Sequence, residues 1–325
     1  MQAVLLREYG GPEVLRLEEV SDPEPDPGDV VVELRAVAVN RRDTAVRKGA
    51  YGDFELPLVP GSDGAGVRRD TDEEVVLLPS LAWGEREDVP GDDFRILGGL
   101  DDGTYAELIK IPGENVFPKP RRLSWEEAAA LPLAGLTAYR ALFTRARLRR
   151  GESALVLGAG SGVSTFLVSL AAQAGARVFV TSSSEDKIER ARELGAEAGV
   201  DYTAGDWVSE LQSVAGGAVD VVVDSVGATW PDSLRCVSRG GRVVAFGATA
   251  GTEAQLAVRP FYLEQLSLLG TTMGSPREFA RLLRMVESGS WTPVVDSIRP
   301  LAEAGQAHAR MEAGVHFGKL VLGIG

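Results

Sequence analysis

Apolar and polar positions alternate in short runs over residues 1–118, which predicts a β-rich module. The runs VVVELRAVAV (30–39) and EEVVLLPSL (73–81) have the two-residue period of strands. Turn-forming residues such as SDPEPDPGD (21–29) separate these runs. Short strands that follow one another in this way are typical of a small barrel-like module.

From about residue 121 the pattern changes to an alternation of helices and buried strands. Segment 123–143 is predicted to be helix-rich, with Ser124 as an N-cap residue. The alternation that follows predicts a parallel sheet covered on both faces, and hence a doubly wound α/β domain. The predicted strands are 154–158, 177–181, 219–224, 241–247 and 266–272, and the clearest helices are 161–175 and 185–195.

The C-terminal segment returns to the pattern of the first module. Residues 294–301 and 318–325 are predicted strands, with a helix over 301–314 between them. We assign these strands to the first module. The predicted domains are therefore residues 1–120 with 290–325, and residues 121–289.

Composition limits the classes of function. With 325 residues, 44% of them apolar, and no long uncharged apolar run, the chain has the composition of a two-domain soluble enzyme. The N-terminus has no secretory signal pattern, so we expect a cytoplasmic protein. The partner expected of such an enzyme is a small-molecule substrate. A net charge of −13 argues against nucleic-acid and membrane partners. The one dense basic stretch, 145–150, is more simply a solvated helix end.

Few side chains suit a zinc site. The chain has one Cys and two His, so counting excludes a structural four-Cys zinc site and we predict no metal. Cys236 is expected to be a buried small hydrophobic residue rather than a nucleophile.

A glycine-rich loop, GAGSGVS (158–164), lies between the first predicted strand and helix of the α/β region. Glycines let the backbone approach a pyrophosphate, and the helix that follows directs free N–H groups towards it. The third glycine of the usual motif is replaced by Ser164, which is small enough for close packing of helix on strand. This context favours dinucleotide binding over an ordinary tight turn.

The end of the second strand indicates which dinucleotide binds. NAD enzymes place a carboxylate there to bind the ribose, but this chain has TSSSEDK (181–187). Ser182, Ser183 and Lys187 would be within reach of a 2′-phosphate, so NADP is favoured over NAD. The same residues are also a helix-capping sequence, and both interpretations are compatible.

Taken together, these motifs resemble the medium-chain dehydrogenase/reductase superfamily over nearly the whole chain, and its zinc-free quinone oxidoreductase branch in particular. The motifs that carry the resemblance are LPLAGLTAYRALF, the glycine-rich loop, TSSSEDKIERARELGA, VDVVVDSVG, GGRVVAFGA and FGKLVL. The resemblance implies a GroES-like catalytic domain of barrel-like shape, joined to a Rossmann-type cofactor domain.

The resemblance also implies roles for individual residues. Segment 38–51 is similar to the active-site segment, so Asn40, Asp43 and Tyr51 are expected to line the nicotinamide and substrate pocket. Asp43 could instead be a structural partner for Arg41 or Arg42, Asn40 could only hold backbone, and Tyr51 could be an ordinary loop aromatic. The remaining implied cofactor contacts are Thr137 beside the nicotinamide, Gly160, Ser161, Gly162 and Val163 at the pyrophosphate, Lys187 and Tyr202 at the 2′-phosphate, and Phe246, Gly247, Ala248 and Lys319 elsewhere around the cofactor.

Departures from the superfamily pattern bear on the chemistry. Zinc-dependent members carry a Cys in the segment that Asn40 to Asp43 occupies here, and Gly-His-Glu in place of Gly61, Ser62 and Asp63. Both soft ligands are missing. The resemblance therefore implies hydride transfer to a quinone or an enone without zinc, with Tyr51 and Asn40 as hydrogen-bond donors and solvent as a competitor for that task.

Other functions stay open on the same scaffold. These are an enoyl-thioester or alkenal reductase, an alcohol dehydrogenase-like enzyme, and an NADPH-binding sensor without turnover. The apolar segment LSLLGTTMG (266–274) would leave an unpaired sheet edge, so we also expect a homodimer.

Overall fold

The computed structural model describes residues 1–289 and 291–325, which form two compact units. Unit 1 comprises Met1–Leu136 and Gly274–Gly325, and unit 2 comprises Thr137–Met273. Residue 290, where a predicted domain was to begin, lies outside the described residues.

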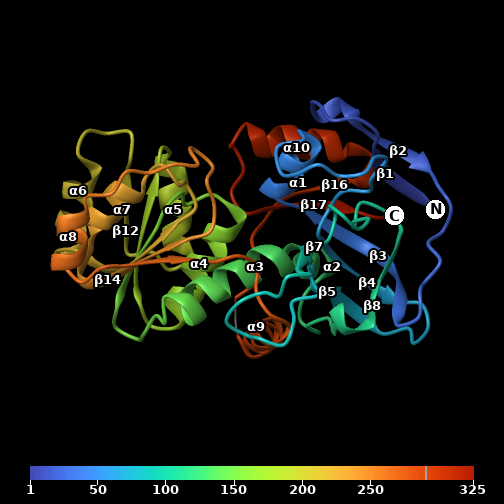
Figure 1. The fold of residues 1–325 in the computed structure, drawn as a ribbon, viewed down its shortest axis with the longest axis horizontal. Coiled ribbons are helices and arrows are strands. Elements are labelled where there is room, and N and C mark those ends of the chain that lie inside the picture. Colours follow the sequence, from blue (N-terminus) through green and yellow to red (C-terminus); the bar gives the residue numbers. More distant parts are fainter. Residues whose placement is uncertain (290) are drawn as a thin grey trace. The chain divides into compact units, whose positions relative to one another are not determined.

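Unit 1 is built around a mainly antiparallel sheet of seven strands (Figure 1). The strand order is β16-β17-β3-β4-β5-β9, and β8 also pairs with the long β3. Apolar side chains from both ends of the chain, such as Val32, Leu77 and Leu320, form its core. The strands are β3 (Asp29–Val39), β4 (Asp63–Arg68), β5 (Glu74–Leu77), β8 (Leu108–Pro112), β9 (Val116–Pro118), β16 (Val295–Pro300) and β17 (Lys319–Gly323).

The register of three strands in this sheet gathers polar residues. Leu320 of β17 pairs with Val39 of β3, and Asp63 of β4 pairs with Ala38 of β3. The residues beside these pairs, Asn40 and Lys319, are thereby brought next to Asp63. The remaining elements of unit 1 are β1 (Gln2–Leu6), β2 (Leu15–Glu19), β6 (Ser80–Leu81), β7 (Arg95–Ile96), α1 (Arg41–Arg47), α2 (Trp125–Ala130), α9 (Pro276–Ser288), α10 (Ala304–Glu312), and the 3-10 turns Pro12–Val14, Gly113–Asn115 and Leu301–Glu303.

Unit 2 is a parallel sheet of six strands in the order β12-β11-β10-β13-β14-β15. Counted along the chain from β10, this order is third, second, first, fourth, fifth, sixth, which is the dinucleotide-binding arrangement. The doubly wound α/β fold is therefore confirmed. Its elements are β10 (Ser153–Val156), α4 (Gly162–Gln173), β11 (Arg177–Ser182), α5 (Glu185–Glu193), β12 (Ala198–Asp201), α6 (Trp207–Ala215), β13 (Val219–Asp224), α7 (Trp230–Cys236), β14 (Val237–Ala245), α8 (Val258–Leu263) and β15 (Ser267–Gly270).

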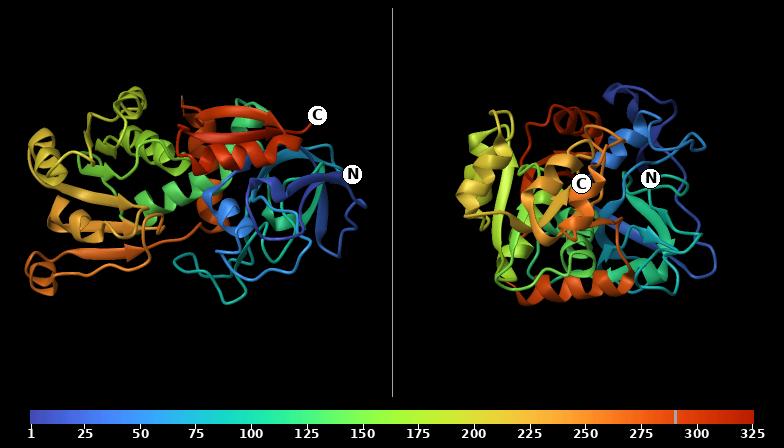
Figure 2. Two further views of the ribbon diagram at one scale, coloured as in Figure 1. Left: turned by 90° about the horizontal axis from the view of Figure 1, so that it is seen from above. Right: turned by 60° about the vertical axis from the view of Figure 1, so that its left-hand side comes forward.

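Strand β15 is the outermost strand on one side of this sheet, and Figure 2 shows it, in orange, along the margin of unit 2. One of its edges pairs with β14, whereas the other pairs with no described strand. The predicted edge strand is thus present, over a shorter span than 266–272.

Several predicted boundaries differ from the structure. The helix-rich segment 123–143 divides into α2, α3 (Pro132–Tyr139) and a π-helical turn, Arg140–Arg145. Ser124 caps α2 as predicted, since its Oγ accepts a hydrogen bond from the backbone N–H of Glu127. The predicted strand 73–81 ends at Leu77 and a separate short strand follows, and β12 was not predicted at all.

The predicted domain boundaries at residues 120 and 290 also differ from those of the two units. Helices α2 and α9 fall in unit 1, although both lie in the predicted domain 121–289. Helix α9 packs there because Phe279 contacts Phe117 edge to face, with ring centroids 5.1 Å apart. In addition, Nε of Arg122 donates a 2.7 Å hydrogen bond to the carbonyl of Val286.

Candidate active site and cofactor site

Asn40 is the N-cap residue of α1 and the first residue after β3. Its backbone N–H donates a 2.8 Å hydrogen bond to Oδ2 of Asp43, which forms part of a capping box at the start of the helix. The extended backbone of Asn40 ends the strand and begins the helix. The local sequence therefore determines the position of Asn40 at the junction between β3 and α1.

Asp43 is fully buried, and polar groups surround its carboxylate. The hydroxyl of Tyr105 donates to Oδ2 at 3.2 Å, the hydroxyl of Ser62 lies 3.4 Å from Oδ1, and Nη1 of Arg42 lies 3.7 Å from Oδ1. Burial raises the pKa of Asp43 to about 6, although Arg42 opposes this effect. These contacts suit a residue that positions its neighbours, and of the two arginines that the sequence left open Arg42 is the ionic partner. The predicted catalytic role of Asp43 stays a prediction.

Tyr105 connects Asp43 to His308 of α10. The tyrosine hydroxyl lies 3.0 Å from Nε2 of His308, and both side chains are fully buried. Burial lowers the pKa of His308 to about 3 and raises that of Tyr105, so both groups are neutral near pH 7. Neither residue was predicted from the sequence. His308 was missed because it lies on the apolar face of its helix, like a core residue.

A second cluster joins Asn40, Asp63 and Lys319. Nζ of Lys319 lies 2.8 Å from Oδ2 of Asp63 and 2.6 Å from Oδ1 of Asn40. Nδ2 of Asn40 donates to the same Asp63 oxygen at 2.9 Å, and the backbone N–H of Leu133 donates to Oδ1 of Asp63 at 2.7 Å. All three side chains are buried. Lys319, predicted as a cofactor contact, thus forms a buried ion pair within unit 1.

Arg42 lies beside these clusters and contacts Tyr51. Nη1 of Arg42 donates to Oγ of Ser62 and to the carbonyl of Leu97, both at 2.8 Å. Its guanidinium carbon lies 4.9 Å from the centre of the Tyr51 ring, a cation–π contact. Tyr51 is 47% exposed. Tyr51 was predicted from the sequence, whereas Arg42 was named there only as a possible partner of Asp43 and not as a contact of Tyr51.

The donor set around Asn40 and Asp63 does not fit a zinc ion. Zinc sites in proteins rely on thiolate and imidazole ligands, whereas the corresponding side chains here are an amide and a hydroxyl. The ammonium of Lys319 already bonds to the Asp63 and Asn40 oxygens, and it would repel a second cation. Over residues 1–289 and 291–325, no three His, Cys, Asp or Glu side chains are grouped so that they could hold a metal.

The glycine-rich loop of unit 2 connects β10 to α4. Gly158 adopts a left-handed backbone with φ of 75°, directly after the strand. Ser161 is the N-cap of α4, and its Oγ accepts a 3.1 Å hydrogen bond from the N–H of Ser164. Ser164 is fully buried between helix and strand, as its size suggested. Of the other predicted pyrophosphate residues, Gly160 lies in the turn, and Gly162 and Val163 are the first two residues of α4.

The predicted phosphate residues lie where β11 and β12 end. Ser182 is the last residue of β11, and its carbonyl accepts a 3.2 Å hydrogen bond from the N–H of Tyr202. Ser184 caps α5 through the N–H of Lys187, so the capping interpretation of this segment holds. Ser183 is exposed and Lys187 is half-buried. No carboxylate ends β11.

Asp224, which the sequence analysis did not single out, organises the ends of β13 and β14. Its carboxylate accepts hydrogen bonds from the N–H groups of Val226 and Gly227 and from the hydroxyls of Thr229 and Ser233, at 2.7–3.1 Å. The carbonyl of Asp224 accepts from the N–H of Phe246, the first of the three predicted residues 246–248 after β14. Thr137, the remaining predicted cofactor residue, lies on α3 and is buried.

Unit 2 fits a nicotinamide dinucleotide. The strand order places the β10–α4 loop at the point where the order reverses, which is where dinucleotides bind in such sheets. The helix that follows is twelve residues long and begins at this loop, so its N-terminal N–H groups can face a pyrophosphate.

Two family models match the chain. One, described as alcohol dehydrogenase GroES-like domain, matches residues 26–121, and the other, described as zinc-binding dehydrogenase, matches residues 162–288. A zinc-type alcohol dehydrogenase-like protein of Schizosaccharomyces pombe is 33% identical, with 100% of this chain and 99% of that protein covered. The quinone oxidoreductase of Mus musculus is 31% identical, with 99% of this chain and 97% of that protein covered.

Solved structures show the same likeness. A crystal structure of an NAD-dependent alcohol dehydrogenase is 41% identical, with a TM-score of 0.95 and 100% of both chains covered. A crotonyl-CoA carboxylase/reductase in complex with NADP is 26% identical, with a TM-score of 0.90 and 99% of this chain and 94% of that chain covered.

The fold and its relatives define a nicotinamide-dependent oxidoreductase. The chain belongs to the medium-chain dehydrogenase/reductase superfamily, as its motifs predicted. Within the described residues, no helix is long and apolar enough to cross a membrane.

Proposed function

We propose that this protein reduces a quinone or a related α,β-unsaturated carbonyl with NADPH and without zinc. The observation that carries the proposal is the Lys319 ammonium, held between Asn40 and Asp63 among the residues that would hold a metal in a zinc-dependent relative. Without a metal to polarise an alcohol, an electron-poor acceptor is the easier substrate. The likeness to quinone oxidoreductases supports the same choice.

Bound NADPH would supply a hydride from C4 of its dihydronicotinamide. The protein's own part is to bind the cofactor, to orient the acceptor and to stabilise charge on its oxygen. In unit 1, Asn40 and Tyr51 are the predicted hydrogen-bond donors, and Arg42 holds the Tyr51 ring. The position of Tyr51 on an exposed surface makes it accessible to a substrate.

The choice of NADPH rests on the end of β11. Ser182 ends this strand in place of the carboxylate that NAD enzymes use to bind the ribose. Lys187 in the first turn of α5 adds a positive charge, beside the carboxylates of Glu185 and Asp186 in the same turn. The NADP complex of a carboxylase/reductase with the same fold supports this choice, whereas an NAD-dependent relative at 41% identity is the strongest argument against it.

A second candidate is reduction of an enoyl thioester. The crotonyl-CoA carboxylase/reductase among the similar structures favours it, and the hydride chemistry at the β-carbon is the same. The two candidates differ in the acceptor. NADPH consumption should therefore be measured with 1,2-naphthoquinone and with crotonyl-CoA. Faster turnover of the quinone supports the proposal, and turnover of the thioester alone replaces it with the second candidate.

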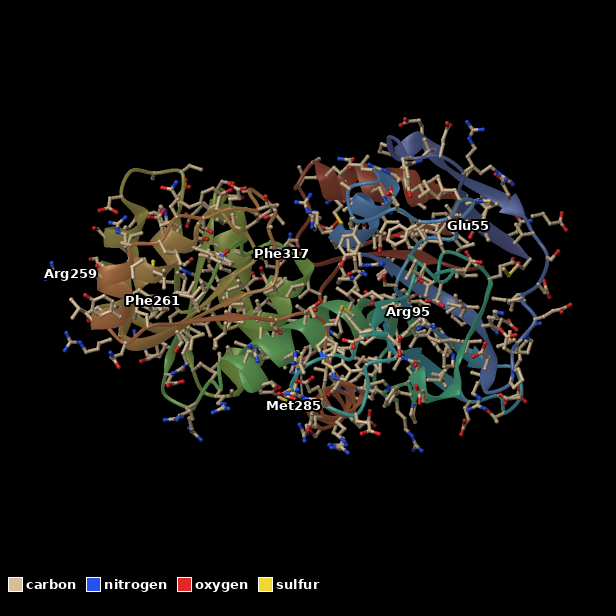
Figure 3. All side chains as sticks on the ribbon, in the orientation of Figure 1. Glu55, Arg95, Arg259, Phe261, Met285 and Phe317 are labelled. Carbon is tan, nitrogen blue, oxygen red and sulfur yellow. The ribbon has the colours of Figure 1, made fainter. Side chains whose placement is uncertain are left out.

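We further propose that the chain acts as a homodimer that pairs through β15. In α8, the helix that precedes this strand along the chain, Val258, Tyr262 and Leu263 are apolar and more than half exposed, at 71%, 55% and 52%. Arg259 of the same helix projects away from the ribbon (Figure 3). An unpaired strand edge and exposed apolar side chains are both features that a second copy can cover.

A further inference from the structure

The hydrogen bonds around Lys319 leave one N–H group of its ammonium without an acceptor among the described residues. Oδ1 of Asp63 accepts from the Leu133 N–H, and Oδ2 accepts from both Asn40 and Lys319. Oδ1 of Asn40 accepts the second N–H of Lys319. An ammonium has three N–H groups, and among the described residues the third meets no acceptor. Lys319 is only 2% exposed, so this N–H is a buried donor that lacks a protein partner.

The remaining N–H is also held in place. Lys319 is the first residue of β17, and its backbone N–H donates to the carbonyl of Val294 at 2.8 Å. Two of its three ammonium protons are donated to Asn40 and Asp63. Asn40 directly follows β3, and Asp63 is the first residue of β4 in the same sheet. A donor fixed in this way needs no reorganisation when negative charge develops near it, which is the condition for strong electrostatic stabilisation.

We propose that this third N–H of Lys319 binds the carbonyl oxygen of the substrate and stabilises its negative charge during hydride transfer. The inference rests on the proposed function. With an enone and NADPH, the hydride forms a bond to the β-carbon, the C=C pair moves to form the enolate, and the C=O pair moves to oxygen. Lys319 keeps its proton and donates a hydrogen bond to that oxygen, while a proton from solvent adds to the α-carbon. The products are the saturated ketone and NADP⁺.

The variants must separate this role from folding. Lys319→Met alone leaves the Asp63 carboxylate buried without its cation, and we expect its Tm to fall by about 5–15 °C. The double variant D63N/K319M removes both charges and should recover most of this loss. Lys119→Met is the matched control, since Lys119 is also buried in unit 1 and paired with a carboxylate, that of Glu74, at 3.2 Å.

Turnover and cofactor affinity then distinguish a substrate contact from a cofactor contact. For D63N/K319M we expect kcat with the enone or quinone to fall about 100- to 1000-fold. NADPH affinity, measured by fluorescence, should stay within about threefold of the wild-type value, as should both quantities in the Lys119 control. A double variant that binds NADPH much more weakly but turns over normally when saturated would show that Lys319 serves the cofactor, and would overturn the inference.

A binding measurement tests the inference independently of turnover. The probe is 4-nitrophenolate, whose charged oxygen resembles that of an enolate, added to the protein saturated with NADP⁺. Wild-type protein should bind the phenolate about 10- to 100-fold more tightly than D63N/K319M. Equal affinities would overturn the inference even if the wild-type protein reduces quinones. Lack of NADPH oxidation with any acceptor would instead contradict the proposed function, whatever the phenolate result.

Discussion

The hydroxyl of Tyr105 lies 3.0 Å from Nε2 of His308, and neither side chain has measurable exposure. Tyr105 has one hydroxyl proton, which it donates to Asp43 at 3.2 Å. The neutral imidazole of His308 therefore carries its proton on Nε2 and donates it to the tyrosine oxygen. These three residues connect α1, the loop before β8 and α10.

The hydrogen-bonded series Asp43–Tyr105–His308 predicts a specific pH dependence of stability. Burial lowers the pKa of His308 from 6.5 to about 3, so the unfolded state binds a proton that the folded state does not as pH falls below 6.5. The stability that neutral His308 contributes is present above pH 6.5 and is lost progressively down to about pH 3. His308→Gln can still donate to Tyr105 but does not titrate. Between pH 7 and pH 4 the variant should lose about 3 kcal/mol less unfolding free energy than the wild type.

Titration of Asp43 changes stability with pH in the opposite direction, and it is present in both the wild type and the His308→Gln variant. Burial raises its pKa from 3.8 to about 6, so its contribution is greatest below pH 3.8 and is lost as pH rises through 6. Urea unfolding at several pH values measures the difference between wild type and His308→Gln directly. Parallel stability curves for the two proteins would mean that His308 titrates normally and is not held neutral in the folded state.

Cofactor preference should depend on Lys187. Its charge and the Ser182 hydroxyl contribute hydrogen bonds to a 2′-phosphate worth roughly 1–3 kcal/mol, or a 10- to 100-fold preference for NADPH over NADH. Lys187→Ala should weaken NADPH binding by most of that factor and leave NADH binding nearly unchanged. Arg192→Ala, in the last turn of the same helix, is the control. Equal losses for both cofactors would mean that Lys187 only supports the loop, and tighter binding of NADH by the wild type would remove the basis for choosing NADP.

Asp224 should be essential to the stability of unit 2. Its fully buried carboxylate satisfies two backbone N–H groups and two hydroxyls. Asp224→Ala leaves those donors without a partner, and we expect a loss of about 3–5 kcal/mol in thermal or urea unfolding. Asp232→Ala, which removes a surface ion pair with Arg235, should cost less than about 1 kcal/mol. A loss for Asp224→Ala as small as that of the control would contradict this account.

The proposed dimer has its own test. Leu263→Glu places a charge on the exposed apolar surface of α8 and should shift the protein from dimer to monomer in light scattering at micromolar concentration. Leu100→Glu, at an exposed leucine of unit 1, should leave the dimer intact. If the wild-type protein is already a monomer at that concentration, the proposal fails.

Local sequence determined much of the fold. The run VDVVVD forms β13 over the residues predicted, because the three consecutive valines 221–223 are suited to a buried parallel strand. Strand β12 was missed because AGVD contains little apolar or β-branched signal and becomes a strand only by pairing with β11. The boundary near residue 290 differs from that of unit 1 because α9 packs on Phe117, a contact that no local pattern reveals.

The candidate site shows the same division. Asn40 was proposed as a site residue from a local segment, and its capping role follows from the same few residues. The pair between Asp63 and Lys319 joins positions 256 residues apart, so only the register of β17, β3 and β4 brings them together. Tyr105 and His308 likewise meet across 203 residues. Neither pair has a signal in a single sequence.

The proposed reduction proceeds with NADPH and without a metal ion. The most direct test measures NADPH oxidation with 1,2-naphthoquinone by protein that has been dialysed against EDTA and shown to contain well under one zinc per chain. Turnover should be the same before and after dialysis, and added zinc should not increase it. Loss of turnover on dialysis, with recovery on addition of one equivalent of zinc, would contradict the account.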